Sequence, residues 1–250
     1  MTSVSIIIPY YKKKKFFKKT ITSVLNQSFK DFEIFIVFDE GNNKNLEFIK
    51  QISRQDERIK LIINKNNFGA GISRNIGIKK SIGKFIAFID ADDIWHKDKL
   101  NKQLKFMYNK KSVASHTSYQ IINENGKVLS DRPAKQLNYS DLLNSCDIGL
   151  STVMIKKILF QKNILFPNLK TKEDYVLWLK LSKKGIVFDA IETNLAKWRS
   201  SKLSLSSSTI QKIKDAFLVY SKYEKLSMSI SLYRVLILSL SYIKKKIKNI

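Results

Sequence analysis

Carboxylates are scarce in this sequence, so their placement indicates where chemistry could take place. The 250 residues include 46 Lys and Arg but only 21 Asp and Glu, which gives a formal net charge of +25. Seven of the 21 acids lie in three short clusters, namely Asp39-Glu40, Asp90 with Asp92-Asp93, and Glu173-Asp174. Grouped carboxylates repel one another unless a cation compensates them, and a carboxylate can also act as a general base. The clusters therefore predict parts of a catalytic or ligand-binding site.

The strongest signal is Asp90-Ala91-Asp92, which directly follows the apolar run 84–89. Hard divalent cations such as Mg²⁺ and Mn²⁺ take oxygen ligands and usually keep a substrate phosphate in their coordination shell. The same acids would also suit a solvated turn in which an Asp caps the helix expected near Lys97. The motif alone leaves both interpretations open, and the other two clusters favour the cation site.

The hydrophobic pattern of the first 95 residues predicts the elements that position these acids. Strands are expected at 3–8 (ended by Pro9), 33–38, 58–63 and 84–89, and helices at 18–27, 46–54 and 70–80. Strands that alternate with helices predict an α/β fold with a Rossmann-like, mostly parallel sheet flanked by helices. Ligands bind beyond the carboxyl ends of such strands, where the first two acidic clusters lie.

The alternation is less regular beyond residue 95. Helices are expected near 97–107 and over 173–183, and strands near 113–122, 127–129 and 151–155. The sequence Asn123-Glu124-Asn125-Gly126 predicts a hairpin turn. A Ser-rich stretch at 200–208 predicts a boundary before a helical tail over 210–250.

Composition excludes several classes of site. The single cysteine, Cys146, excludes an internal disulfide and a cysteine-based metal cluster, and two histidines are too few for a multi-histidine zinc site. His96 and His116 are expected on the surface or in loops. So basic a chain favours a polyanionic partner, either nucleic acid or an anionic membrane surface. The N-terminus has no basic segment before its short apolar run and no cleavage site, so we expect a cytoplasmic chain.

Five motifs occur in a specific order. They are Ile6-Ile7-Ile8-Pro9-Tyr10-Tyr11 followed by Ser23-Val24-Leu25-Asn26-Gln27-Ser28; Asp39-Glu40-Gly41; Asn67-x-Gly69-x-x-x-Ser73-Arg74-Asn75-x-Gly77; Asp90-Ala91-Asp92-Asp93; and Glu173-Asp174 with Leu177-Trp178-Leu179. Together they resemble the family 2 glycosyltransferases, inverting enzymes of bacterial surface-glycan type that have the GT-A fold and use nucleotide-sugar donors. The likeness covers residues 3–205. It implies a GT-A catalytic domain over 1–205, with a nucleotide-sugar-binding half at 1–95 and an acceptor-side half at 96–205. A basic amphipathic tail over 206–250 would follow.

The resemblance implies roles for the residues of the nucleotide site. Pro9 and Tyr10 would line the pocket for the base, and Asp39 would accept a hydrogen bond from uracil or an equivalent base. Arg74 would lie near the nucleoside or the diphosphate. These residues would recognise a nucleotide-sugar donor, with a UDP-sugar favoured.

The resemblance also implies the residues of the reacting end. Asp90 and Ala91 would contact the ribose or the sugar, Asp92 would bind Mn²⁺ or Mg²⁺, and Asp174 would be the general base. The metal would stabilise the departing diphosphate as a Lewis acid, while the base takes a proton from the acceptor hydroxyl. For Asp174 the alternative is a structural one, because Thr171-x-x-Asp174 resembles a capping box.

The chain departs from the family pattern in a few places. Tyr11 stands where Asn is common, and Glu40 where a second Asp is frequent. Many relatives carry a His in the segment that here reads Ala196-Lys197-Trp198-Arg199-Ser200. Arg199 or Lys202 would then neutralise the diphosphate in its place.

The tail combines apolar and basic character. Residues 226–243 are apolar apart from serines and a central Arg234, and Lys244, Lys245, Lys246 and Lys248 follow. A spanning helix with a central Arg is costly, whereas a helix in the membrane interface is not. We expect docking on an anionic membrane surface, with packing on the catalytic domain or a second subunit as the alternative.

These features predict a glycosyltransferase that moves a sugar to a hydroxyl of a glycan or lipid-linked acceptor at the inner face of the cell membrane. An oligomer formed through the C-terminal helices is compatible with the sequence. One alternative is a basic nucleic-acid-binding protein, but no recognisable module supports it and no nucleic-acid partner is expected. Another is a nucleotidyltransferase on a related α/β fold, which would need a Gly-rich phosphate loop near the N-terminus.

Overall fold

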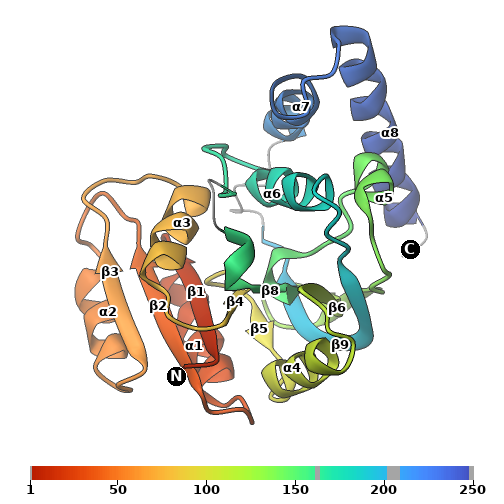
Figure 1. The fold of residues 1–250 in the computed structure, drawn as a ribbon. Coiled ribbons are helices and arrows are strands. Elements are labelled where there is room, and N and C mark those ends of the chain that lie inside the picture. The colour runs from red at the N-terminus through yellow and green to blue at the C-terminus, as the bar shows by residue number, and fades with distance from the viewer. Residues whose placement is uncertain (1, 161–163, 202–208, 248–250) are drawn as a thin grey trace.

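The computed structural model describes residues 2–160, 164–201 and 209–247 (Figure 1). Its first part alternates strands and helices in the predicted order. These elements are β1 (Val4–Tyr10), α1 (Lys14–Leu25), β2 (Phe32–Phe38), α2 (Leu46–Ser53), β3 (Ile59–Ile63), α3 (Ala70–Lys80) and β4 (Phe85–Phe88).

The second part mixes short strands and helices. Its elements are β5 (Ile94–Trp95), α4 (Lys99–Asn109), β6 (Ala114–Ile122), β7 (Val128–Arg132), α5 (Tyr139–Asn144), the 3₁₀ helix η1 (Leu150–Thr152), β8 (Met154–Lys156), the 3₁₀ helix η2 (Lys157–Phe160), α6 (Glu173–Ser182) and β9 (Asp189–Arg199). The predicted hairpin turn is confirmed between β6 and β7, where Gly126 has a φ of 91°. The strand expected at 151–155 is instead η1 followed by β8.

The strands form a single sheet in the order β3-β2-β1-β4-β8-β6-β9-β5, with β7 paired to the outer part of β6. Strands β3, β2, β1 and β4 are parallel, as predicted. The sheet becomes mixed beyond β4, because β8 is antiparallel to both β4 and β6, whereas β6 and β9 are parallel. The parallel half brings the carboxyl ends of β1, β2 and β4 to one edge.

Alternate residues of the central strands enter cores on opposite faces of the sheet. On β1, Ile6 and Ile8 join one hydrophobic cluster and Ile7 joins the other, and none of the three is exposed. This double burial explains the continuous apolar run. The strand does not end at Pro9 as predicted but continues to Tyr10. Its pairing with β4 extends only to Ile7, so the missing N–H of Pro9 interrupts no ladder on that side.

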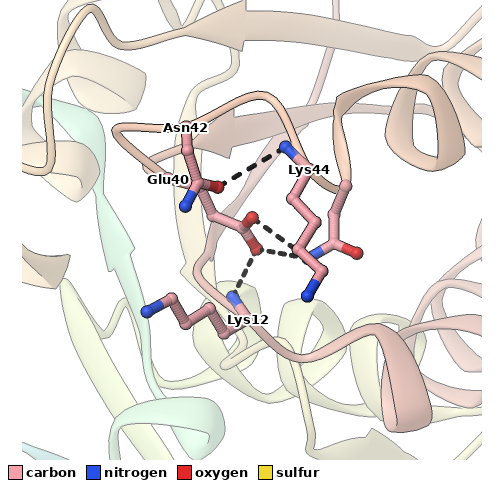
Figure 2. Close-up of a pocket in the computed structure, with 5 residues that line it drawn as sticks. Lys12, Glu40, Asn42 and Lys44 are labelled. Carbon is pink, nitrogen blue, oxygen red and sulfur yellow. Dashed lines mark hydrogen bonds between the residues drawn. The ribbon is translucent and has the colours of Figure 1, made fainter.

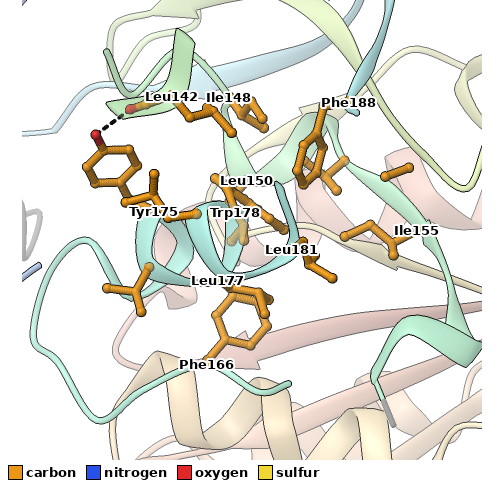
Figure 3. Close-up of a cluster of buried hydrophobic side chains, with 14 of the residues drawn as sticks. Leu142, Ile148, Leu150, Ile155, Phe166, Tyr175, Leu177, Trp178, Leu181 and Phe188 are labelled. Atoms are coloured by element: carbon orange, nitrogen blue, oxygen red, sulfur yellow. Dashed lines mark hydrogen bonds between the residues drawn. The ribbon is translucent and has the colours of Figure 1, made fainter. Parts of the chain in front are cut away.

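Most residues of helix α6 are buried (Figure 3). Trp178 is fully buried and packs edge-to-face against Phe166 and Phe188, with ring centroids 6.2 and 5.3 Å apart. The Tyr175 hydroxyl donates to the carbonyl oxygen of Leu142 on α5 at 2.5 Å. These contacts fix the first turn of α6, which carries the acidic pair Glu173-Asp174.

The C-terminal segment packs against the rest of the chain. It contains α7 (Thr209–Leu218), a π-helical turn (Val219–Tyr223) and α8 (Met228–Ile247), with Lys225 at a left-handed φ of 57° before α8. Figure 1 shows α7 and α8 beside α6 and α5. Within the described residues, no helix has the length and apolar character that crossing a bilayer requires. The boundary expected at residue 205 lies outside the described residues.

Candidate active site

The predicted acids of the first two clusters meet at the carboxyl edge of the parallel sheet. Asp39 follows β2, and Asp90, Asp92 and Asp93 follow β4, on either side of β1 in the strand order. The first turn of α6 adds Glu173 and Asp174 to the same region, because Arg74 joins Glu173 to Asp90. Sequence elements that are about a hundred residues apart therefore contribute to one site.

Asp39 organises the loop that precedes α3. Its carboxylate is buried, with Oδ1 accepting hydrogen bonds from Asn64 Nδ2 at 2.7 Å and from the Phe68 N–H at 2.9 Å. Its Oδ2 accepts from the Gly69 N–H at 2.8 Å. Gly69 has a φ of 86°, a left-handed conformation that favours glycine. Three internal donors therefore already occupy the carboxylate that was predicted to meet the base.

The third motif builds α3 into the site. Asn67 Nδ2 donates to the Asp39 carbonyl at 2.9 Å, and Asn75 exchanges two hydrogen bonds with the backbone of Phe166. A side chain at Gly77 would come within 2.7 Å of Ile7, so only glycine allows α3 to approach β1 this closely. The motif residues thus hold α3 between the sheet and the segment that leads to α6.

Arg74 bridges the two halves of the site. Its guanidinium is almost fully buried and contacts Asp90 Oδ1 and Glu173 Oε1, each at 2.7 Å. Burial alone would lower the pKa of Arg74, but the charges of Asp90 and Glu173 outweigh it and raise that pKa. Nε of Arg74 is buried without a hydrogen-bond partner. The Asp90 side chain remains about one-third exposed, at 32%, so it can still contact a ligand.

Asp92 and Asp93 differ in their surroundings. Asp92 Oδ2 lies 2.6 Å from Lys13 Nζ, and its side chain is 12% exposed. Asp93 is buried and accepts hydrogen bonds from Ser151 Oγ and the Arg199 N–H. Burial raises the pKa of both carboxyls, and the charges of neighbouring aspartates raise it further. Asp93 is therefore a structural acid, while Asp92 borders the site.

The side chains of Tyr10 and Arg199 do not lie where the sequence predicted. Tyr10 is fully buried and packs between Phe17 and Phe38, so it does not present its ring to a base. Arg199 is also buried, and its guanidinium donates to the Asp92 carbonyl and to two carbonyls of the β6–β7 turn. This internal bonding does not favour the predicted diphosphate contact. Lys202 lies outside the described residues.

A hydrogen bond to its backbone carbonyl fixes the position of Ala91. Its methyl group is buried in the core, and its carbonyl accepts a hydrogen bond from Thr20 Oγ1 at 3.1 Å. The contact ties the acidic loop after β4 to α1.

Asp174 is not part of a capping box. The N–H and hydroxyl of Thr171 both donate to Asp215 Oδ2 on α7, at 2.9 and 2.7 Å, so the Thr171 hydroxyl is not directed at α6. Asp174 Oδ1 accepts from the Tyr175 N–H at 2.7 Å. Burial raises the pKa of Asp174, and the charge of Asp90 adds to this effect while Arg74 opposes it. A carboxylate with a raised pKa is better suited to accept a proton.

Sequence reasoning missed Tyr119 on β6. Burial raises the pKa of its hydroxyl to about 12, and the charges of Asp93 and Asp174 act in the same direction. A side chain at Gly149 would lie 3.1 Å from the Tyr119 ring. No motif surrounds Tyr119, so only the fold reveals it.

A pocket of about 380 Å³ lies beside the ends of β1 and β2 (Figure 2). It is lined by Lys12, Glu40, Asn42, Lys44 and Asn45. Glu40 Oε1 accepts hydrogen bonds from the Lys12 N–H at 2.7 Å and from Asn45 Nδ2 at 2.9 Å. Glu40, which departs from the family pattern, thus fixes the loop after β1 to the loop after β2.

No metal-binding group of three His, Cys, Asp or Glu side chains occurs among the residues that the structure describes. A divalent cation that binds with a substrate diphosphate needs only one or two protein carboxylates. Asp92 meets this requirement, because the cationic Lys13 group lies directly against its carboxylate. The donor set therefore fits such a cation.

Comparison with known proteins agrees with this geometry. The family model for glycosyl transferase family 2 matches residues 5–165, more than half of the chain. An uncharacterized glycosyltransferase of Rickettsia felis is 39% identical over 203 residues, which cover 80% of this chain but 33% of that protein. The chain thus spans about a third of the length of this curated relative.

Two further proteins cover more of the chain. The Escherichia coli enzyme WfgD, a UDP-Glc:alpha-D-GlcNAc-diphosphoundecaprenol beta-1,3-glucosyltransferase, is 36% identical over 213 residues, covering 84% of this chain and 82% of WfgD. The crystal structure of residues 1–349 of Staphylococcus aureus TarS with UDP-GlcNAc has a TM-score of 0.72 at 20% identity, and the match covers 93% of this chain and 70% of that TarS fragment. The likeness to TarS confirms the predicted GT-A type of α/β fold. The family match and the identity to WfgD establish that this chain belongs to glycosyl transferase family 2.

Proposed function

We propose that this protein transfers a sugar from a nucleoside diphosphate sugar, with UDP favoured, to a hydroxyl of a lipid-linked glycan, with inversion. The observation that carries the proposal is the Arg74 bridge, which holds Asp90 of the strand edge and Glu173 of α6 within 2.7 Å of one guanidinium. Asp174 directly follows Glu173 on α6, so the bridge supports a site to which Asp174 and the acids after β4 both contribute. In the proposed enzyme, the bridge would hold the donor site and the proton acceptor in a fixed relation.

The reaction needs a base on one side of the anomeric carbon and charge neutralisation on the other. The acceptor oxygen attacks the anomeric carbon, its proton passes to Asp174, and the bond to the diphosphate breaks. A divalent cation, when bound, would neutralise the leaving diphosphate. Asp92 would hold this cation, while Asp90, oriented by Arg74, would contact the ribose or the sugar. Inversion follows because the attacking and leaving oxygens lie on opposite faces of the sugar.

The nucleotide base would lie near the pocket lined by Lys12, Glu40 and Asn45. Asp39 would contribute by holding the loop up to Gly69 in place, and Pro9 by its position at the end of β1. The UDP-GlcNAc bound by TarS supports a uridine nucleotide as the first donor to test.

The acceptor proposed is a glycan on a lipid diphosphate. WfgD, whose name gives a diphosphoundecaprenol acceptor, supports this class. Such an acceptor would require the protein to work as a peripheral protein at the inner face of the cell membrane. Neither alternative function has a comparable observation in its favour. The family match over residues 5–165 includes Arg74, Asp90 and Asp92, whereas Asp174 lies beyond it.

The decisive experiment is a thermal-shift panel of UDP-, GDP-, CDP- and dTDP-sugars with and without Mn²⁺. Ligand binding to the folded state raises the melting temperature by mass action. We expect one nucleotide class to stabilise the protein and Mn²⁺ to increase the shift. Asp92→Asn should remove the Mn²⁺-dependent part and leave the melting temperature of the free protein nearly unchanged. A protein that responds to none of these donors would contradict the proposal.

A further inference from the structure

The outward face of α8 carries a continuous row of apolar side chains. Leu232, Leu236, Leu240 and Ile243 follow one another at spacings of four, four and three residues, so they share one face of the helix. They are 55, 56, 44 and 50% exposed. Other apolar side chains of the segment are also exposed, namely Met228, Ile230 and Tyr233 on α8 and Ile210 and Ile213 on α7. An exposed apolar row of this kind marks a place where another body binds.

The opposite face of α8 already has its partners within the chain. Ser231 and Leu238 are buried, and Leu238 belongs to the core cluster that includes α6. Arg234 Nη1 donates to Asn144 Oδ1 on α5 at 2.7 Å, and Ser241 Oγ donates to the Asn144 carbonyl. The central arginine is thus turned toward the protein. The predicted packing alternative therefore accounts for the inner face and leaves the outer face uncovered.

The charges around this face have one sign. Lys214 on α7, Lys222 in the π-helical turn and Lys225 after that turn are exposed. Lys244 is exposed near the end of α8. Residues 209–244 contain only two carboxylates, Asp215 and Glu224.

Both of these carboxylates face inward. Asp215 is 3% exposed and binds Thr171, and Glu224 is 5% exposed and binds Lys183 and Tyr139. The solvent-facing side of this segment therefore presents aliphatic and cationic groups without an exposed carboxylate.

We propose that the outer face of α7 and α8 docks on the surface of an anionic lipid bilayer, with α8 lying in the plane of the interface. The inference deepens the proposed function by identifying the membrane-binding surface, and it rests on that function for its biological context. Aliphatic side chains would enter the boundary between headgroups and acyl chains, while the lysines contact anionic headgroups. A second copy of the chain is a poorer occupant, because its own lysines would be brought against these lysines with no exposed carboxylate between them.

The inner side of α7 is hydrogen-bonded to the segment that precedes the candidate base. Asp215 on α7 accepts two hydrogen bonds from Thr171, which lies three residues before Asp174. In Figure 1, α7 lies beside helix α6, which carries Asp174 in its first turn. Docking through α7 and α8 would therefore hold the acceptor side of the site close to the bilayer, where a lipid-linked diphosphate resides.

Cosedimentation with phosphatidylcholine vesicles, with and without phosphatidylglycerol, tests the proposal on the full chain. The parent protein should bind the anionic vesicles and be released by salt. The combined variant Leu232→Gln, Leu236→Gln, Leu240→Gln should lose about tenfold or more in vesicle affinity. A control with Ile82→Gln, Tyr108→Gln and Ile158→Gln changes side chains of similar exposure on other elements and should bind like the parent.

The charge contribution has its own pair of variants. Lys222→Gln, Lys225→Gln, Lys244→Gln should lose the preference for anionic vesicles, whereas Lys79→Gln, Lys102→Gln, Lys105→Gln, at exposed lysines of α3 and α4, should keep it. As a measurement on an intact face, Leu236→Trp should give fluorescence that brominated lipids quench, and Ile82→Trp should not. The proposal would be overturned if the three leucine substitutions reduced vesicle binding no more than their control, or if the three lysine substitutions on the tail changed the lipid preference no more than theirs. It would also be overturned if brominated lipids quenched Leu236→Trp no more than Ile82→Trp.

Sedimentation velocity adds the remaining outcome. A protein that ignores vesicles but forms a dimer, and that becomes monomeric with the three leucine substitutions, would show that the face is a contact between copies and would overturn the proposal. The nucleotide-dependent thermal shift tests the proposed glycosyltransferase function and is measured in a separate experiment. Vesicle binding without any nucleotide response would support this inference and contradict the proposed glycosyltransferase function. A nucleotide response without vesicle binding would support the proposed function and contradict this inference.

Discussion

The ammonium group of Lys13 lies 2.6 Å from the carboxylate of Asp92, at the position where the acidic motif predicts a cation. Burial and the neighbouring Asp90 raise the pKa of Asp92, and Lys13 opposes them. Lys13 directly precedes α1, so the loop after β1 supplies this charge. The lysine therefore compensates the acidic loop in the absence of a ligand and would compete with a divalent cation for Asp92.

This competition predicts that Lys13→Gln binds Mn²⁺ about tenfold more tightly, because a unit charge a few ångströms from the site is removed. The measurement is calorimetric titration of Mn²⁺ without nucleotide. Lys15→Gln is the matched control, since Lys15 pairs with the exposed Glu124 and should leave the Mn²⁺ affinity unchanged. Weaker Mn²⁺ binding by Lys13→Gln would show that the lysine assists the cation instead.

The Arg74 bridge predicts a large loss of stability on truncation. Arg74→Met would leave Glu173 buried and unpaired, and breaking a buried pair in this way costs about 3–5 kcal/mol. The free energy of unfolding can be measured by urea titration. Adding Glu173→Gln should restore part of the loss, because the uncompensated charge is then gone. If the double variant is no more stable than Arg74→Met, the loss must arise from packing around Phe166, over which the guanidinium lies.

Asp174→Asn should reduce turnover by about 10²- to 10⁴-fold, the usual contribution of a general base. The amide keeps the shape of the side chain and can still accept from the Tyr175 N–H, but it cannot take a proton. Donor affinity, measured by the thermal shift, should stay the same. Glu192→Gln, at an exposed acid of β9, is the control with unchanged turnover. Full activity of Asp174→Asn would assign the proton transfer to another group.

The parallel half of the fold was predictable because its strands β1, β2 and β4 are buried on both faces, which leaves unbroken apolar runs in the sequence. Helix α1 begins earlier than expected, at Lys14, because Phe16 and Phe17 are buried although lysines surround them. Strand β9 was missed, since Glu192, Thr193 and Asn194 are exposed and interrupt any alternating pattern. Strand β9 depends on its parallel pairing with β6, which is a contact between distant segments.

The acids of the site were predictable for a related reason. The first two clusters directly follow strands with a strong local pattern, and Glu173-Asp174 begins a helix with one. The residues that contact these acids were not predictable. Arg199 looked like a free cation but is used in internal hydrogen bonds, and the Tyr119 ring lies close to Gly149, thirty residues further along the chain. His116, expected on the surface or in a loop, is buried on β6 with Nε2 2.9 Å from the Lys135 carbonyl oxygen. Residue type and spacing do not report such long-range contacts.

Lys99 is the clearest case of a residue whose environment the sequence conceals, and it predicts the pH dependence of stability. Its side chain is fully buried at the start of α4, with Nζ 4.2 Å from the centre of the Trp95 ring and 2.8 Å from Gln103 Oε1. Burial lowers the pKa of Lys99 to about 7. Between about pH 7 and the ordinary lysine pKa near 10.4, the unfolded chain therefore binds a proton that the folded chain does not.

Because the unfolded state binds more protons in this range, the contribution of Lys99 to the free energy of unfolding rises as the pH increases from about 7 to about 10. The penalty for burying the amine is fully present below pH 7 and is relieved toward pH 10. Lys99→Met removes the titrating group and keeps an apolar side chain against Trp95, so the variant should be more stable than the parent by a few kcal/mol at pH 7. Urea titrations at several pH values should show this advantage shrinking as the pH rises. Lys102→Met, at an exposed position of the same helix, is the control and should change the free energy of unfolding by the same amount at every pH. If the stability difference between Lys99→Met and the parent does not depend on pH, the buried amine does not titrate in this range.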